Sequence, residues 1–202
     1  MTATVLDERR VRPLSETRAA TFGEGGTAVG RTGVRVRQVD AGDLPAVETY
    51  LLGLGPSDRR ARFLSYPADA AITSYVRGID LSVTVLVGAF DQNDRMVGLA
   101  EAHPTGAPLT VEIAVSIDRA LRRYGWGQRL VAQALALAFA RGMQSAEFVF
   151  APTNGALARL VQTLGGRMTA PGHALIDRSA NLLQCVRFDA RLGPLGINNE
   201  PV

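Results

Sequence analysis

The 202-residue sequence contains no lysine: all 22 of its Lys and Arg positions are arginine. Against 19 acidic residues, this leaves a formal net charge of only +3 at pH 7. Nucleic-acid binding needs a clustered basic surface, whereas these arginines are spread along the chain. The small excess of positive charge therefore does not favour a nucleic-acid partner.

Cysteine and histidine are almost as scarce. The one cysteine, Cys185, excludes a disulfide within the chain and a metal site built from cysteines. The two histidines, His103 and His173, are far apart in the sequence, so a histidine-rich metal site is not expected either. No apolar run approaches the ~20 residues that a membrane helix needs, and the polar start of the chain does not resemble a secretory signal. We therefore expect a cytoplasmic protein with no metal and no membrane partner.

The rest of the composition, 47% hydrophobic and 20% charged, is typical of a globular protein. Residues 1–33 contain few large apolar side chains and many glycines, so they are expected to form a flexible N-terminal tail. Residues 193–202 are rich in turn-forming residues and are expected to form a C-terminal tail. One domain is therefore predicted over residues 34–192.

Hydrophobic periodicity predicts the elements of that domain. Alternation predicts strands at residues 34–37, 83–90, 96–102, 109–117 and 146–150. Helical spacing predicts helices at residues 40–53, 57–63, 69–76, 127–141 and 154–164. Two closing strands are expected, one at 167–170 or 174–177 and one at 183–188. This order predicts a mixed α/β domain, with helices on both faces of a mostly antiparallel sheet of six to seven strands.

One segment suggests chemistry: the run from Arg122 to Gly127, Arg-Arg-Tyr-Gly-Trp-Gly, lies between a predicted strand and a predicted helix. Glycine allows close approach of the backbone to a ligand, and a helix N-terminus offers free N–H groups and positive potential. With Arg129 adding charge, the segment predicts a cradle for a diphosphate. It matches neither the dinucleotide-binding GxGxxG, because Leu130 stands at the third glycine position, nor a P-loop. An ordinary turn is the alternative.

The pattern Arg-x-x-Gly-x-Gly between a strand and a helix resembles the pyrophosphate loop of the GNAT superfamily of N-acetyltransferases. The order of elements from Val34 to Phe188 also resembles that fold. Asn154, followed by Leu160, Leu164 and Gly165, is similar to the family's second cofactor segment. The resemblance implies the GNAT fold, with acetyl-CoA or another acyl-CoA as cosubstrate and an amine as acceptor.

The resemblance also implies roles for individual residues. The main chain of the strand before the loop would pair with the pantetheine arm, the loop amides would hold the pyrophosphate, and Asn154 would contact the arm from the far side. A plain helix N-cap is an equal alternative for Asn154. Tyr124 and Trp126 could stack on the adenine, although packing against the sheet is the expected outcome for both. The implied cofactor residues are Val115, Ile117, Arg122, Arg123, Tyr124, Gly125, Trp126, Gly127 and Asn154.

Amine acetylation requires a base, because the amine must lose a proton before it attacks. No histidine lies near the loop in the sequence. Glu112 lies on the strand that leads into the loop and shares a face with the small residues Ala114 and Ser116, which fit the floor of a substrate channel. Partial burial there would help it hold a proton. Its position also resembles that of the general base in bacterial Pat-type protein lysine acetyltransferases, to which residues 57–63 are weakly similar. An exposed residue or an ion pair is the alternative.

Glu101, on the preceding strand, is a second candidate, for binding a cationic substrate; a solvated strand residue is the alternative. Many family members carry a tyrosine seven residues after Asn154 that protonates the leaving thiolate. Val161 stands there and is expected to belong to the core. The general acid is therefore unassigned, and a CoA-binding sensor or regulatory module without turnover is a second hypothesis. The acceptor, a protein lysine or a small amine, and a homodimer are left open.

Overall fold

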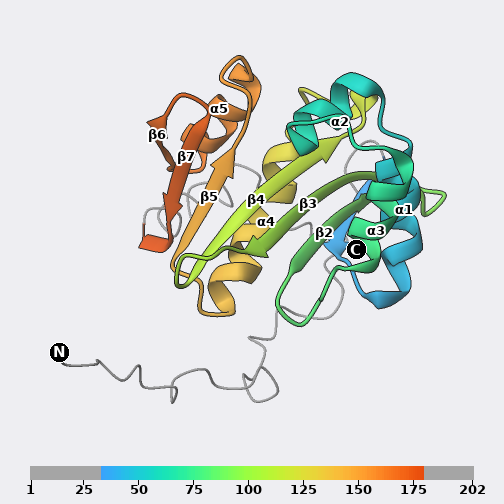
Figure 1. Cartoon of the computed structure of the whole chain (residues 1–202), viewed down its shortest axis with the longest axis horizontal. Helices are drawn as coiled ribbons and strands as arrows, with labels where there is room; N and C mark the ends of the chain where they lie inside the picture. Colours follow the sequence, from blue (N-terminus) through green and yellow to red (C-terminus); the bar gives the residue numbers. More distant parts are fainter. Residues whose placement is uncertain (1–32, 180–202) are drawn as a thin grey trace, which may run out of the picture.

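The computed structural model describes residues 33–179, which form one open sheet with helices on both faces (Figure 1). The strands are β1 (Arg35–Gln38), β2 (Val85–Phe90), β3 (Met96–Pro104), β4 (Thr110–Ile117), β5 (Ser145–Val149), β6 (Arg167–Ala170) and β7 (His173–Asp177). The helices are α1 (Leu44–Leu52), α2 (Pro56–Phe63), α3 (Asp69–Arg77), α4 (Trp126–Ala140) and α5 (Gly155–Thr163), with 3-10 turns η1 (Ala41–Asp43) and η2 (Arg119–Leu121). The predicted strand at 183–188, Cys185 and the predicted tails, apart from residue 33, lie outside the described residues.

The seven strands lie in the order β1-β2-β3-β4-β5-β7-β6. Every neighbouring pair is antiparallel except β4 and β5, which run parallel. The mixed, mostly antiparallel sheet predicted from the sequence is therefore confirmed. Both candidate segments for the first closing strand form strands, β6 and β7, which pair with each other.

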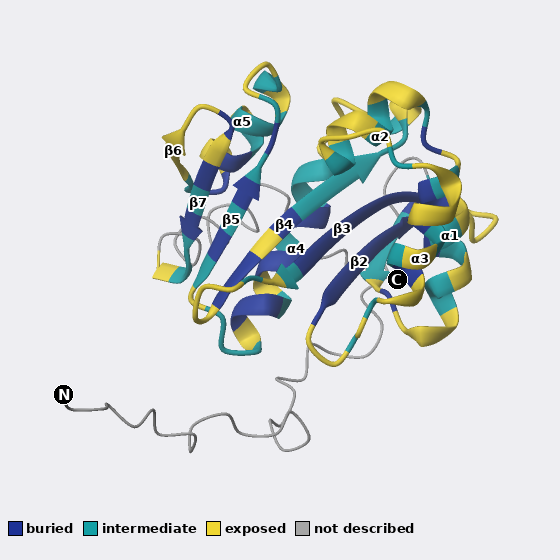
Figure 2. Ribbon diagram, in the orientation of Figure 1, coloured by how far each residue is buried: buried dark blue, intermediate teal, exposed yellow. Residues whose placement is uncertain are grey.

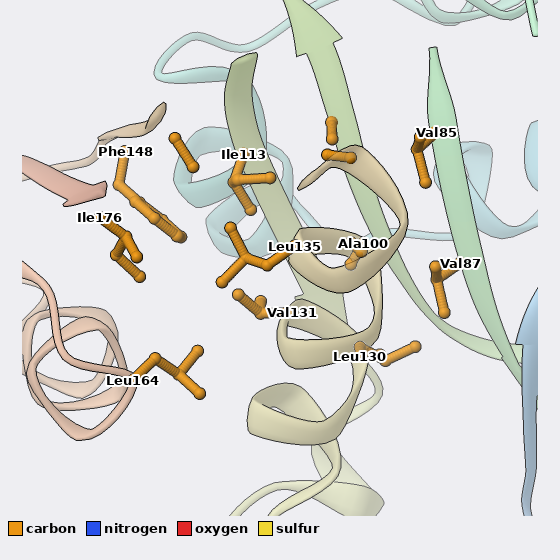
Figure 3. Packing of buried hydrophobic residues seen from close by; sticks show 14 of the residues in the cluster. Val85, Val87, Ala100, Ile113, Leu130, Val131, Leu135, Phe148, Leu164 and Ile176 are labelled. Atoms are coloured by element: carbon orange, nitrogen blue, oxygen red, sulfur yellow. The ribbon is translucent and has the colours of Figure 1, made fainter. Parts of the chain in front are cut away.

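The alternation within the strands separates two apolar layers. One face of the sheet packs on α4, whose Leu130, Val131 and Leu135 are fully buried against residues such as Ala100 and Ile113 (Figure 3). The other face packs on α1 and α3 through a second buried cluster. β2 and β3 lie between the two layers, so every residue of β2 is buried (Figure 2). β4 is held in place by its ladder with the buried strand β3.

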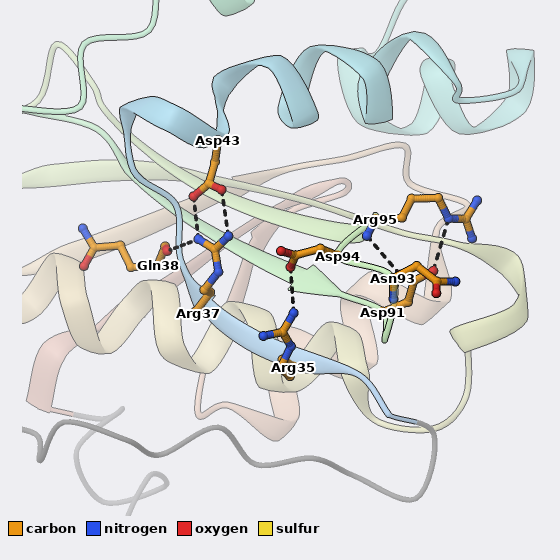
Figure 4. Close-up of polar contacts among 8 residues, drawn as sticks. All are labelled: Arg35, Arg37, Gln38, Asp43, Asp91, Asn93, Asp94 and Arg95. Atoms are coloured by element: carbon orange, nitrogen blue, oxygen red, sulfur yellow. Dashed lines mark hydrogen bonds and ion pairs between the residues drawn. The ribbon is translucent and has the colours of Figure 1, made fainter.

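Within the described residues, β1 is an edge strand of the sheet, and its arginines form ion pairs (Figure 4). Arg37 donates two hydrogen bonds to Asp43, of 2.5 and 2.7 Å, and Arg35 Nη2 lies 2.7 Å from Asp94 Oδ1. The bond from Arg37 holds the pKa of Asp43 below its ordinary value. Asp40 caps the turn before α1, because its side chain accepts a bond from the backbone N–H of Gly42. Charged side chains of this kind protect an edge strand from pairing with another chain.

Within residues 33–179, no helix is long and apolar enough to span a membrane. Over the same residues, no group of three or more His, Cys, Asp or Glu side chains is arranged to hold a metal ion.

Candidate functional site

The parallel strands β4 and β5 pair over only three residues each, and the last pair joins Glu112 to Glu147. Beyond that pair the strands diverge, as Figure 1 shows. The divergence opens a cleft of about 1180 Å³ between α2 and β4 on one side and α5 and the end of β5 on the other. Of the predicted cofactor residues, those that line the cleft are Val115, Ile117, Arg122, Arg123, Gly125, Gly127 and Asn154.

The wall formed by β4 presents main-chain groups to the cleft. On its other edge, β4 stays paired with β3 as far as Ile117. On the edge that faces β5, ladder pairing within the described chain stops at Glu112. An extended ligand can pair with such an open strand edge through main-chain hydrogen bonds. Val115 and Ile117 lie along this open stretch, on the strand before the loop that the sequence predicted for them.

The loop after β4 turns its backbone toward the cleft at two positions of positive φ, 68° at Arg123 and 82° at Gly125. Gly125 is the N-cap of α4 and offers no side chain to accept a bond from the helix. The first N–H groups of a helix have no partner within it, so those of α4 remain available to an anion. A Cβ atom built on Gly125 would meet nothing within 4 Å. The loop is therefore an open, electropositive backbone cradle.

The two aromatic residues of the loop behave differently. Trp126 packs into the core, as expected, with 6% of its surface exposed. Tyr124 is 74% exposed, so the expected packing against the sheet is wrong for this residue. Tyr124 lies in the turn between β4 and α4, between two residues of positive φ, and not in a regular element that packs on the sheet. Neither side chain lines the cleft.

A carboxylate on α2 joins this helix to the loop on the same side of the cleft. Arg122 Nη2 donates a 2.8 Å hydrogen bond to Asp58 Oδ1, and its Nε donates to the carbonyl of Ile117. Arg119 lies 3.4 Å from the other oxygen of Asp58 and donates to Ser57 Oγ. Asp58 and Ser57 belong to the segment that the sequence singled out. These contacts hold α2 beside the loop, and they partly neutralise the charge of Arg122.

On the far wall, Asn154 is the N-cap of α5, because its Oδ1 accepts a 3.1 Å bond from the backbone N–H of Leu157. The N-cap alternative is therefore observed, and the residue also lines the cleft. Seven residues further, Val161 is fully buried in the core, as expected. No hydroxyl is present at this position to protonate a leaving group.

Glu112 stands where the cleft begins, at the last paired position between β4 and β5. It lines a smaller cavity of about 150 Å³, together with Arg62, Phe63 and Leu64 from the end of α2. The side chain is exposed, so the partial burial expected from its small neighbours is not observed. Directly opposite, Glu147 on β5 adds a second carboxylate. Glu112 is therefore an exposed carboxylate that lines a small cavity.

Glu101 lies one strand away and is 1% exposed. Arg62 donates to its Oε1 from Nε at 2.9 Å, and Tyr75 OH donates to its Oε2 at 2.5 Å. Burial alone would raise the pKa of Glu101, but the charge of Arg62 and the hydrogen bonds lower it to about 2. The alternative of a solvated residue is therefore wrong. An acceptor amine could touch this carboxylate only after Arg62 had moved away.

Comparison with known proteins identifies the fold and the family. The family model described as acetyltransferase (GNAT) family matches residues 57–165. The chain belongs to the GNAT family. The matched residues run from α2 to the end of α5 and include both walls of the cleft. The family expectation drawn from the loop is thereby confirmed.

Several solved GNAT structures share the fold. The GNAT domain of S. lividans PAT is 17% identical, with a TM-score of 0.59 over 71% of this chain and 90% of that one. Spermidine N-acetyltransferase from Vibrio cholerae, in complex with CoA and spermine, is 15% identical, with a TM-score of 0.59 over 74% and 98%. A phosphinothricin acetyltransferase from Sinorhizobium meliloti, in complex with AcCoA, is 19% identical, with a TM-score of 0.56 over 72% and 88%. No curated protein sequence matches the chain.

The sequence reasoning missed His103 as a neighbour of the GNAT cleft. His103 pairs directly with Glu112 in the β3–β4 ladder, on the same face of the sheet. Distance from the loop along the sequence concealed this proximity. The signal was available in the hairpin: if residues 96–102 and 109–117 pair as antiparallel strands with a short turn, position 103 must come near position 112.

Proposed function

We propose that this GNAT protein transfers an acetyl group from acetyl-CoA to a primary amine, with Glu112 as general base. The observation that carries the proposal is the divergence of β4 and β5 directly above the open cradle at Gly125. This arrangement offers an extended arm a strand edge and offers a diphosphate the amides of a helix N-terminus, within one continuous cleft.

The residues of the cleft suit acetyl-CoA at both ends of the molecule. The loop amides and Arg123 would hold the diphosphate, while the open edge of β4 at Val115 and Ile117 would hold the pantetheine arm. Main-chain N–H groups on this edge would polarise the thioester carbonyl, which makes it more susceptible to attack. Acetyl-CoA itself would supply the activated acyl group.

Glu112 would take the proton from the incoming ammonium group, directly or through one water, and leave a neutral amine to attack the carbonyl carbon. The accessibility of Glu112 and the narrow cavity beside it support this role. The C–S bond of the thioester breaks as the amide C–N bond forms. A thiolate with a pKa near that of cysteine, about 8.5, can leave without a strong acid, so Val161 is compatible with turnover.

The acceptor class is proposed as a primary amine, either a small molecule or a protein lysine. Among the proteins of similar structure, the one from Vibrio cholerae is a spermidine N-acetyltransferase. Two others are the GNAT domain of S. lividans PAT and a phosphinothricin acetyltransferase. The small size of the cavity beside Glu112, about 150 Å³, suits one unbranched amine chain. A polyamine or a lysine side chain would fit this description.

The experiment is a thiol-release assay with acetyl-CoA and a panel of polyamines, amino acids and lysine peptides. Glu112→Gln is expected to lower kcat/KM for the accepted amine by about 10²–10⁴-fold. Glu147→Gln removes the same charge one strand away and should have a much smaller effect. Equal activity of Glu112→Gln and the wild type would remove Glu112 from the role.

One observation favours a second function, a CoA-binding sensor without turnover: a buried valine occupies the position at which many relatives carry a catalytic tyrosine. Calorimetry separates the two functions. Tight binding of acetyl-CoA with no acceptor turned over would favour the sensor, and absence of binding would exclude both.

A further inference from the structure

A buried polar cluster lies beside Glu112, and we define it as Arg62, Tyr75, Glu101 and His103. It joins α2, α3 and β3 around the Glu101 carboxylate. His103 Nε2 lies 2.8 Å from Tyr75 OH and 3.0 Å from Glu101 Oε2. Nothing in the proposed transfer reaction uses these groups, although one of them is the cross-strand neighbour of the proposed base. We therefore asked which role these four side chains could have beside Glu112.

The contacts determine which nitrogen of His103 carries a proton. Glu101 is a carboxylate and can only accept hydrogen bonds. Tyr75 spends its one hydroxyl proton on Glu101, so toward His103 its oxygen is also an acceptor. A nitrogen that faces two acceptors must be a donor, and Nε2 is therefore protonated. In the neutral ring this leaves the lone pair on Nδ1, which makes no hydrogen bond to any residue of the described chain.

His103 is also well placed to exchange protons with both Glu112 and water. Directly opposed residues of an antiparallel pair have Cβ atoms about 4.5–5.5 Å apart. Within the described residues the two side chains make no direct hydrogen bond or ion pair, so the proton would pass between them through one water. About 29% of the His103 side chain is exposed, so a proton held there can pass to solvent. The carboxylate of Glu101 lies 3.0 Å from the ring on its Nε2 side.

We propose that Glu101 and Tyr75 fix the tautomer of His103, and that His103 relays the proton of the acceptor amine from Glu112 to solvent. The inference rests on the proposed function. An N–H bond of the ammonium breaks as an O–H bond forms on Glu112; that O–H bond breaks as an N–H bond forms on Nδ1 of His103. Nδ1 then releases the proton to water. Glu112 returns to its carboxylate form, ready for the next amine.

The charged and titratable groups that face His103 come from four elements. Glu101 neighbours it on β3, Tyr75 contacts it from α3, and Glu112 lies opposite on β4. From α2, Arg62 reaches it through Glu101 and hydrogen-bonds to Tyr75. Arg62 neutralises the charge of Glu101. Glu101 and His103 together therefore do not retain the relayed proton. Glu112 is then the one neighbour whose protonation changes during the cycle.

Nuclear magnetic resonance of the histidine rings tests the relay without any turnover. The chain has only two histidines, so His173→Gln assigns both signals in a long-range 1H–15N spectrum. The expected neutral form of His103 carries its proton on Nε2. Glu112→Gln should change the chemical shift of Nδ1 of His103, because the carboxylate opposite the ring in the ladder is replaced by a neutral amide. Glu147→Gln, one strand further away, should change it less.

A neutral ring protonated on Nδ1, or an Nδ1 chemical shift that Glu112→Gln leaves unchanged, would overturn the relay. These readouts involve no substrate. Absence of acetyl transfer would thus count against the proposed function alone, and an unexpected tautomer against the relay alone.

Kinetics give a second, independent test. His103→Gln keeps an N–H donor at the position of Nε2 but has no group that can take a proton. With an amine that the wild type acetylates, we expect kcat to fall by about 10-fold or more. The acidic limb of its pH profile should move to lower pH, because the histidine no longer blocks the relay when protonated. Unchanged melting temperature and unchanged acetyl-CoA affinity would exclude a general structural defect. An acidic limb identical to that of the wild type would contradict the proposal.

Discussion

The two ends of the cleft are built in different ways. The cradle consists of six consecutive residues, Arg122 to Gly127, and its proposed role rests mainly on backbone N–H groups at the start of α4. The polar cluster beside Glu112 draws its four side chains from α2, α3 and β3 and depends on each of them. The cradle is therefore built from neighbours in the sequence and is open to ligand. The cluster is built from residues far apart in the sequence, and its side chains bind one another. Substitutions should affect stability most at the cluster and ligand affinity most at the cradle.

The largest expected effect on stability comes from Arg62→Met. It leaves the Glu101 carboxylate buried without its cation, and breaking a buried pair in this way costs about 3–5 kcal/mol. Urea unfolding at pH 7 measures the loss. Arg60→Met is the matched control, because Arg60 lies on the same helix with its side chain in solvent and should change stability little. Similar losses for both variants would show that the cluster is not a closed unit.

Acid unfolding gives the next largest effect. The folded-state pKa of Glu101, about 2, lies below its ordinary value of 4.5. The stability that this carboxylate contributes is therefore fully present above pH 4.5 and is lost as the pH falls toward 2, by roughly 3 kcal/mol in total. Glu101→Gln should be less stable than the wild type at pH 7 and should lose less further stability over this range. Parallel curves for the two proteins would contradict the assignment.

The difference between the two regions also explains what the sequence could predict. The strand, the glycine loop and the helix follow one another in the sequence, so the loop could be predicted from it. Alternation along the strand likewise predicted which face of the sheet carries Glu112. The burial of Glu101 depends on how α2 and α3 pack against β3, which no local pattern encodes. The proximity of His103 to Glu112 follows from the β3–β4 hairpin, but only once the register of the two strands is known. Tyr124 was misplaced for a third reason. The positive φ of Arg123, a residue other than glycine, has no signal in the sequence.

At the cradle, Gly125→Ala tests the backbone directly. The φ of 82° is costly for a residue with a Cβ, so we expect a loss of about 1–2 kcal/mol in unfolding free energy. Nothing within 4 Å would obstruct the new methyl group, so the cost would come from the backbone alone. Gly106→Ala, also in open space and without positive φ, is the control. Calorimetry should show weaker acetyl-CoA binding for Gly125→Ala only; equal binding would separate the cradle from the ligand.

Tyr124→Ala should have the smallest effect on stability and the most informative effect on binding. Because the side chain is 74% exposed, its removal should change the free energy of unfolding by less than about 0.5 kcal/mol. An exposed aromatic ring next to a diphosphate cradle is free to stack on an adenine, and stacking is worth about 1–3 kcal/mol per base. Acetyl-CoA affinity should then fall while the affinity for acetyl-pantetheine, which lacks the adenine, stays constant. A parallel loss for both ligands would instead mean that Tyr124 supports the loop conformation, which would make the cradle less local than its sequence suggests.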